Sequence, residues 1–290
     1  MSGLVAPPVW YRRSDGASHD RFADVVETAT LWAADEYDAA LVGEPFDAAG
    51  ARTATPAAFR EALARTEIRH GDGETAAPLA DLGNVGVDPT ETDVATVRET
   101  LRQYTARIYE HAATPIFFGG DGTLTCSNVA PLLEQGRVGV VRFGSTIRAD
   151  GDRTDSACDS YRRLFSAGLD AMAVVGTRRD EHVAGEWEPL YGRDWHAMSM
   201  AVVDDGPTAA ATDALASLGD VDAVFASVDL PALEASCART GSMVARVAAD
   251  PRIAGVEVIA EESEPEPSAE SVRAGARTVA HFLLGLEERP

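Results

Sequence analysis

Lysine is absent from this 290-residue sequence, so its 25 strongly basic residues are all arginines, set against 47 aspartates and glutamates. The net charge is −22. Such a composition is typical of proteins from a high-salt cytoplasm, where dissolved ions screen the self-repulsion of the chain. We therefore expect a cytoplasmic protein adapted to high salt; an acidic face for a basic partner is the alternative. Phosphates would be repelled, which argues against nucleic acid as a partner.

Cysteines and long apolar runs are also scarce. Cys126, Cys158 and Cys237 are far apart and lack CxxC spacing, so neither a disulfide framework nor a zinc site is expected. The first residues, "MSGLVAPPVWYRR", do not have the charged-then-apolar pattern of a secretory signal. No apolar run reaches the length needed to cross a membrane, so we expect no membrane association.

Short apolar runs alternate with longer amphipathic ones along the chain. Buried strands are expected at 39–43, 115–120, 138–143, 171–176, 198–203, 223–229 and 255–260, with a weaker candidate at 78–83. Helices are expected at 56–65, 127–135, 158–168, 208–218 and 241–249, and from Ser268 to the C-terminus. A further helical pattern covers 90–112, where Thr90 or Thr92 is the expected cap. This alternation predicts one domain spanning residues 1–290. Its expected architecture is a three-layer α/β/α fold with a parallel sheet of about eight strands.

The segment "IFFGGDGTLTCSNV" contains the most conspicuous motif. GGDGT (119–123) follows an apolar strand, and its glycines would let backbone amides approach a phosphate, as in nucleotide-binding kinases. Asp121 could then hold a magnesium-bound water. However, the loop has no lysine or arginine, and the residues after it predict a plain helix and strand. The kinase hypothesis therefore stays a minor alternative.

Five segments together resemble the ureohydrolase family, which comprises arginase, agmatinase and formimidoylglutamase. They are "ADLGNV", "PIFFGGDGTLTCSNVAPLL", "VGVVRFGSTIR", "VFASVDLPALEAS" and "GVEVIAEESEP". They span most of the chain in the family's order and at about the family's spacing. "SNVAPLL" and "SVDL" make the haloarchaeal formimidoylglutamase type look most similar. The resemblance implies an arginase-like fold.

The resemblance also implies a chemistry: hydrolysis of an amidine-type C–N bond by a water that bridges two manganese ions, held by two histidines and four aspartates. Only one aspartate of the six ligands is retained, as Asp229. The other five ligand positions are occupied by Gly122, Gly144, Thr146, Arg148 and Pro231. Arg148 would place a fixed positive charge near a dication, and proline cannot ligate. Asp121 and Asp229 are thus vestigial ligands at best.

Three hypotheses follow. The first is a non-catalytic paralogue of formimidoylglutamase that has lost its binuclear centre and binds no cofactor. The second is an active manganese-dependent hydrolase that rebuilds its site from unorthodox ligands, with candidates Asp150, Asp152, Asp155, Glu261 and Glu262. The third is the kinase hypothesis. The six histidines are scattered and provide no second metal site. Family members commonly oligomerise, so we expect a homo-oligomer or a hetero-oligomer with an active paralogue.

Overall fold

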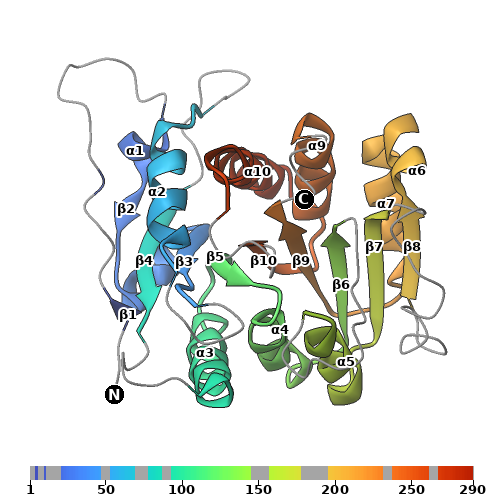
Figure 1. Ribbon diagram of the computed structural model, residues 1–290, viewed down its shortest axis with the longest axis horizontal. Coiled ribbons are helices and arrows are strands. Elements are labelled where there is room, and N and C mark those ends of the chain that lie inside the picture. Colours follow the sequence, from blue (N-terminus) through green and yellow to red (C-terminus); the bar gives the residue numbers. More distant parts are fainter. Residues whose placement is uncertain are drawn as a thin grey trace.

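A single mixed sheet forms the centre of the computed structural model (Figure 1). The structure describes residues 4–5, 10, 21–46, 53–68, 78–86, 93–144, 157–177, 195–230, 237–260 and 267–289. The strands are β1 (Leu4–Val5), β2 (Glu27–Thr28), β3 (Ala39–Gly43), β4 (Leu79–Val85), β5 (Thr114–Asp121), β6 (Val138–Phe143), β7 (Ala171–Thr177), β8 (Trp195–Ser199), β9 (Ala223–Asp229) and β10 (Ile253–Ala260). Their order is β1-β4-β3-β5-β10-β9-β6-β7-β8, and β2 also pairs with β4. All pairings are parallel except that of β1 with β4.

Helices cover both faces of this sheet, which gives three layers (Figure 1). One face carries α2 (Thr55–Arg65), α6 (Met200–Asp205), α7 (Pro207–Ser217), α9 (Cys237–Ala248) and α10 (Ala269–Glu287), with the short α1 (Phe22–Val25) beside α2. The other face carries α3 (Val94–Ile108), α4 (Thr125–Leu133) and α5 (Ala157–Ala167). The 3-10 helix η1 (Leu31–Glu36) precedes β3. No helix in the described ranges is long and apolar enough to span a bilayer.

Alternate residues of each central strand face opposite helical layers. Leu41 and Phe118 pack into the core beneath α2 and α10, whereas Val42 and Phe117 pack beneath α3 and α4. Because both faces are covered, the strands are apolar throughout, as the sequence patterns indicated. We call the face covered by α3, α4 and α5 the lower face.

The predicted fold class is confirmed, with local corrections. The run 198–203 is not one strand: β8 ends at Ser199, and α6 begins at Met200. Short apolar runs fit either structure, which explains the error. The cap of α3 is Asp93, whose carboxylate accepts a hydrogen bond from the amide of Thr96, rather than Thr90 or Thr92. Within the described ranges the sheet has ten strands rather than about eight, because the two-residue β1 and β2 extend one side.

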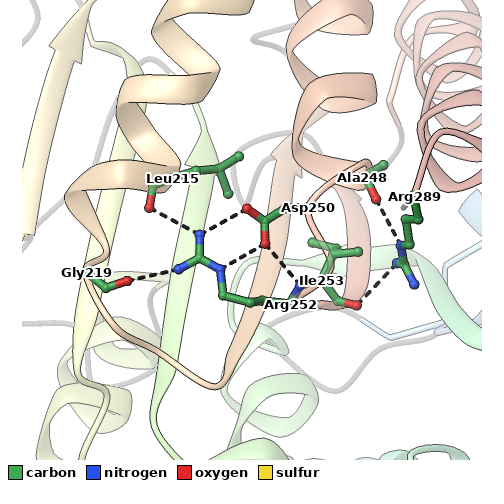
Figure 2. A network of polar contacts seen from close by, with 7 residues as sticks. All are labelled: Leu215, Gly219, Ala248, Asp250, Arg252, Ile253 and Arg289. Atoms are coloured by element: carbon green, nitrogen blue, oxygen red, sulfur yellow. Dashed lines mark hydrogen bonds and ion pairs between the residues drawn. The ribbon is translucent and has the colours of Figure 1, made fainter.

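Two arginines, Arg252 and Arg289, donate hydrogen bonds that link neighbouring segments near the amino-terminal ends of β9 and β10 (Figure 2). Arg252 donates to the carbonyls of Leu215 and Gly219, at the end of α7, and to both carboxylate oxygens of Asp250. Arg289 donates to the carbonyls of Ala248 and Ile253. Two of these carbonyls, those of Leu215 and Ala248, lie in the last turns of α7 and α9, where helix ends leave carbonyls without intrahelical partners. They lie at the edge opposite the loops described next.

Candidate functional site

The carboxyl ends of β5, β10, β9 and β6 lie next to one another in the sheet. Gly122 follows β5, Gly144 follows β6, and Asp229 is the last residue of β9. Parallel register brings these strand ends together: Asp121 pairs with Ala260, and Ile259 pairs with Asp229. The structure therefore brings together three of the predicted ligand positions at one edge, where parallel sheets place their functional loops.

Several predicted site residues lie outside the described residues. They are Thr146, Arg148, Asp150, Asp152, Asp155, Pro231, Glu261 and Glu262. The backbone of Asp121 ends β5, but its side chain is not described. The described histidines are elsewhere: His111 lies near Asp35 at the opposite edge of the sheet, His196 is exposed on β8, and His281 belongs to α10.

Asp229 is neutralised by an arginine that the sequence interpretation did not single out. Arg142 of β6 donates from Nη2 to Oδ2 of Asp229, and their side chains are 7% and 16% exposed. Burial disfavours the charged guanidinium and is the largest single influence on it. The charges of Asp229, Tyr161 and Glu257 and the Tyr161 hydrogen bond together outweigh burial and raise the pKa of Arg142. Arg142 also lies over the ring of Tyr161 and donates to its hydroxyl at 3.0 Å.

The position of Gly144 is closed by this ion pair. A Cβ atom there would lie 2.5 Å from Oδ2 of Asp229 and 3.3 Å from Nε of Arg142. A side chain such as aspartate could be accommodated only if the pair moved. Gly144 and the Arg142–Asp229 pair are therefore mutually dependent features of this chain.

A buried polar row crosses the lower face of the sheet beneath these loops. Glu257 of β10 pairs in register with Ser227 of β9, which pairs with Arg142 of β6. The hydroxyl of Tyr161 donates to Ser227 at 3.3 Å, and Ser227 hydrogen-bonds Glu257. Burial raises the pKa of Glu257, while hydrogen bonds and the charge of Arg142 act in the opposite direction. A hydrogen-bonded chain thus links the Asp229 end of the site to Glu257.

The row continues through α4 to the end of β3. Oγ1 of Thr125 donates to Glu257 at 2.6 Å. The side-chain amide of Asn128 donates to Glu257 and to Glu44, each at 3.1 Å. Burial raises the pKa of Glu44 well above its ordinary value; the Asn128 bond opposes this shift, and the charge of Glu257 adds to it.

Comparison with known proteins decides the family. Residues 37–250 match the model of the arginase family. A formimidoylglutamase from Halobacterium salinarum (strain ATCC 29341 / DSM 671 / R1) is 38% identical over 305 residues, covering 96% of this chain and 98% of that protein. The chain belongs to the arginase family. The predicted resemblance to ureohydrolases of the formimidoylglutamase type is thereby confirmed.

Solved structures of this family share the fold. The formimidoylglutamase of Bacillus subtilis superposes with a TM-score of 0.80 at 20% identity, covering 97% of this chain and 98% of that one. A formiminoglutamase from Trypanosoma cruzi solved with Mn2+ gives 0.73 at 20% identity, covering 91% and 100%. Proclavaminate amidino hydrolase from Streptomyces clavuligerus gives 0.72 at 17% identity, covering 88% and 93%. At these identities the likeness establishes the fold alone.

Family membership leaves the kinase hypothesis without support, and packing gives another reason for the glycines of GGDGT. Gly119 and Gly120 have φ of 94° and 64°, a region that strongly favours glycine. A Cβ on Gly119 would lie 2.6 Å from Cγ of Pro56 and 2.9 Å from the carbonyl oxygen of Glu44. These glycines let the loop turn tightly against the segment after β3 and the start of α2.

The described donors do not fit the two-manganese centre of the family. Gly122 and Gly144 offer no side-chain donor, and Asp229 is paired with Arg142, whose positive charge opposes the binding of a metal cation to the same carboxylate. Among the described residues, no group of three or more His, Cys, Asp or Glu side chains could hold a metal ion. The described residues alone therefore do not provide a ligand set for two manganese ions.

The sequence interpretation missed Arg142, Glu257, Glu44 and Asn128. A signal for the first two was present, because each is a charged residue inside an apolar strand expected to be buried ("VGVVRF" and "GVEVIA"). A buried charge requires a partner. The sequence pattern does not identify the partner of each buried charge, because the contacts join strands and helices that are far apart in sequence.

Proposed function

We propose that this protein is an arginase-family member that has lost the binuclear metal centre and acts as a non-catalytic paralogue of formimidoylglutamase. The observation that carries the proposal is the Arg142–Asp229 ion pair beside Gly144. The guanidinium of Arg142 donates to Oδ2 of the retained aspartate, so the negative charge of Asp229 is balanced without a metal ion. The scaffold is kept, while its chemistry at the described positions is replaced by a salt bridge.

Metal analysis of the purified protein tests the proposal. The protein is saturated with Mn2+ at high salt, desalted, and analysed for bound manganese beside the variant Asp229→Asn. We expect less than one manganese ion per chain, equal in both proteins, and no release of formamide from formimidoylglutamate. Two tightly bound ions in the wild type that are lost in Asp229→Asn would overturn the proposal.

The alternative is an active manganese-dependent amidine hydrolase. The near full-length 38% identity to a formimidoylglutamase favours it. Its ligands would have to include residues outside the described ranges, with Asp150, Asp152, Glu261 and Glu262 as candidates. It predicts manganese-dependent release of formamide, urea or ammonia from formimidoylglutamate, arginine or agmatine. No turnover of these three substrates with metal supplied would exclude it.

We further propose that the protein assembles with itself or with an active formimidoylglutamase in a cytoplasm of high salt. The test is light scattering of the protein alone and mixed with the formimidoylglutamase of the same organism. A mass above one chain, or a complex with altered activity, supports the proposal. A monomer in both samples contradicts it.

A further inference from the structure

Glu44 and Glu257 are two fully buried carboxylates that share one amide. Both residues are 0% exposed. Nδ2 of Asn128 lies 3.1 Å from Oε2 of Glu44 and 3.1 Å from Oε2 of Glu257, so its two N–H groups are divided between them. Oδ1 of Asn128 accepts a bond from the hydroxyl of Thr105 at 3.3 Å, which fixes the orientation of the amide.

The two carboxylates have unequal surroundings. Glu257 receives hydrogen bonds from Thr125, Ser227 and Asn128, and it feels the positive charge of Arg142. Glu44 receives the Asn128 bond at Oε2, while its Oε1 has no hydrogen-bond partner among the described residues. An ionised oxygen without a partner in a dry interior is far more costly than a neutral carboxyl group.

Among the described residues, the other charged and titratable groups around the pair do not supply a second cation. Arg142 is already paired with Asp229. The hydroxyl of Tyr109, just after α3, donates to the carbonyl of Asn128, and that of Tyr161 on α5 donates to Ser227. Burial and the two glutamates raise the pKa of Tyr109, so it remains a neutral phenol. The ionic effect that reaches Glu44 is the repulsion of Glu257.

We propose that Glu44 and Glu257 together hold one proton in the folded protein and so form a proton-binding site beneath the carboxyl ends of β3 and β10. Glu44 carries the proton, because its Oε1 receives no hydrogen bond from the described part of the chain, and Glu257 remains ionised among its three donors. Like charges this close in a dry interior disfavour double ionisation, as in other carboxylate pairs.

The site makes stability depend on pH. Glu44 lies just after β3, and a Cβ built on Gly119 or Gly120 of the GGDGT loop would lie 2.9 Å or 3.4 Å from its carbonyl oxygen. The pKa of Glu44 is higher in the folded chain than the ordinary 4.5 expected in the unfolded one. Its contribution to stability is therefore complete below pH 4.5 and is lost as the pH rises toward the raised pKa. Ionisation places a second charge beneath the loop.

The experiment compares Glu44→Gln with the wild type in denaturant unfolding across the pH range. Glutamine resembles the neutral carboxyl group but cannot lose a proton. In the window between pH 4.5 and the raised pKa, the wild type takes up one more proton on folding than the variant. The ratio of its folding equilibrium constant to that of Glu44→Gln should therefore fall about tenfold per pH unit and level off above the raised pKa. The control Glu110→Gln alters an exposed glutamate and should give a constant ratio.

A spectroscopic measurement covers the case in which Glu44→Gln does not fold. The infrared spectrum of the folded wild type at neutral pH should contain the carbonyl band of a protonated carboxyl group. The band should remain in Glu110→Gln and disappear at alkaline pH. Absence of this band from the folded wild type, or a pH-independent ratio for Glu44→Gln, would overturn the proposal. Neither result depends on whether the protein binds manganese or turns over a substrate.

Discussion

Replacing Arg142 by methionine removes the guanidinium but keeps a long side chain beneath the site. Asp229 would then be left with only 16% of its side chain exposed and without its arginine. Removing one partner of a buried ion pair costs about 3–5 kcal/mol, mostly because the other charge stays buried. Since Asp229 keeps some contact with solvent, we expect the free energy of unfolding to fall by about 3 kcal/mol, toward the low end of that range.

Urea unfolding at high salt, followed by tryptophan fluorescence, measures this loss. The double variant Arg142→Met/Asp229→Leu removes both charges and should lie within about 1 kcal/mol of the wild type, because an apolar pair can replace a buried ion pair. Arg102→Met serves as the control, since Arg102 pairs with Glu99 and Glu134 on the surface and should cost less than about 1 kcal/mol.

The same variants can refute the reasoning. If Arg142→Met is as stable as Arg102→Met, the guanidinium is not what compensates the charge of Asp229. If the double variant is no more stable than Arg142→Met, the loss comes from contacts other than the ion pair, such as the bond to Tyr161. In either case the ion pair could not be regarded as the replacement for a metal.

Two further predictions concern the loop and the charge. Gly119→Ala should lower the free energy of unfolding by about 3 kcal/mol, because φ is 94° and the new Cβ meets Pro56 and the carbonyl of Glu44. The control Gly168→Ala also has a positive φ, 107°, but its new Cβ would meet nothing within 4 Å, so it should lower the free energy of unfolding by only about 1 kcal/mol. If both variants lose the same free energy of unfolding, close packing around Gly119 is not the cause. Raising the salt from about 0.1 M to 1 M, which shortens the screening length from about 10 Å to 3 Å, should stabilise the protein because its net charge is −22. A melting temperature independent of salt would contradict this.

The layered fold could be predicted because its signals are local. Apolar runs of strand length, such as 138–143 and 223–229, occur between amphipathic segments, and the structure confirms both strands. The predicted strand at 198–203 was wrong because a short apolar stretch does not distinguish a strand from a helix. In the folded chain a helix begins at Met200.

The sequence predicted which positions lie at the candidate site, but it did not predict the contacts among their side chains. The family motifs located Gly122, Gly144 and Asp229, and the structure brings their strand ends together. They gave no indication that Arg142 would meet Asp229, because that contact depends on the order of strands in the sheet rather than on sequence spacing. The shared amide of Asn128 depends likewise on how α4 packs under β3 and β10, and no local pattern encodes that arrangement.

The hydrogen bonds of Arg252 and Arg289 at the amino-terminal edge of the sheet have a consequence for the evolution of this chain. Arg252 and Arg289 join the ends of α7 and α9 to the start of β10 without help from the loops at the opposite edge (Figure 2). Substitutions in those loops therefore leave this set of bonds intact. A lineage could in this way exchange a set of metal ligands for a salt bridge and still inherit the same architecture. The scaffold and the chemistry of such a protein can follow separate evolutionary histories.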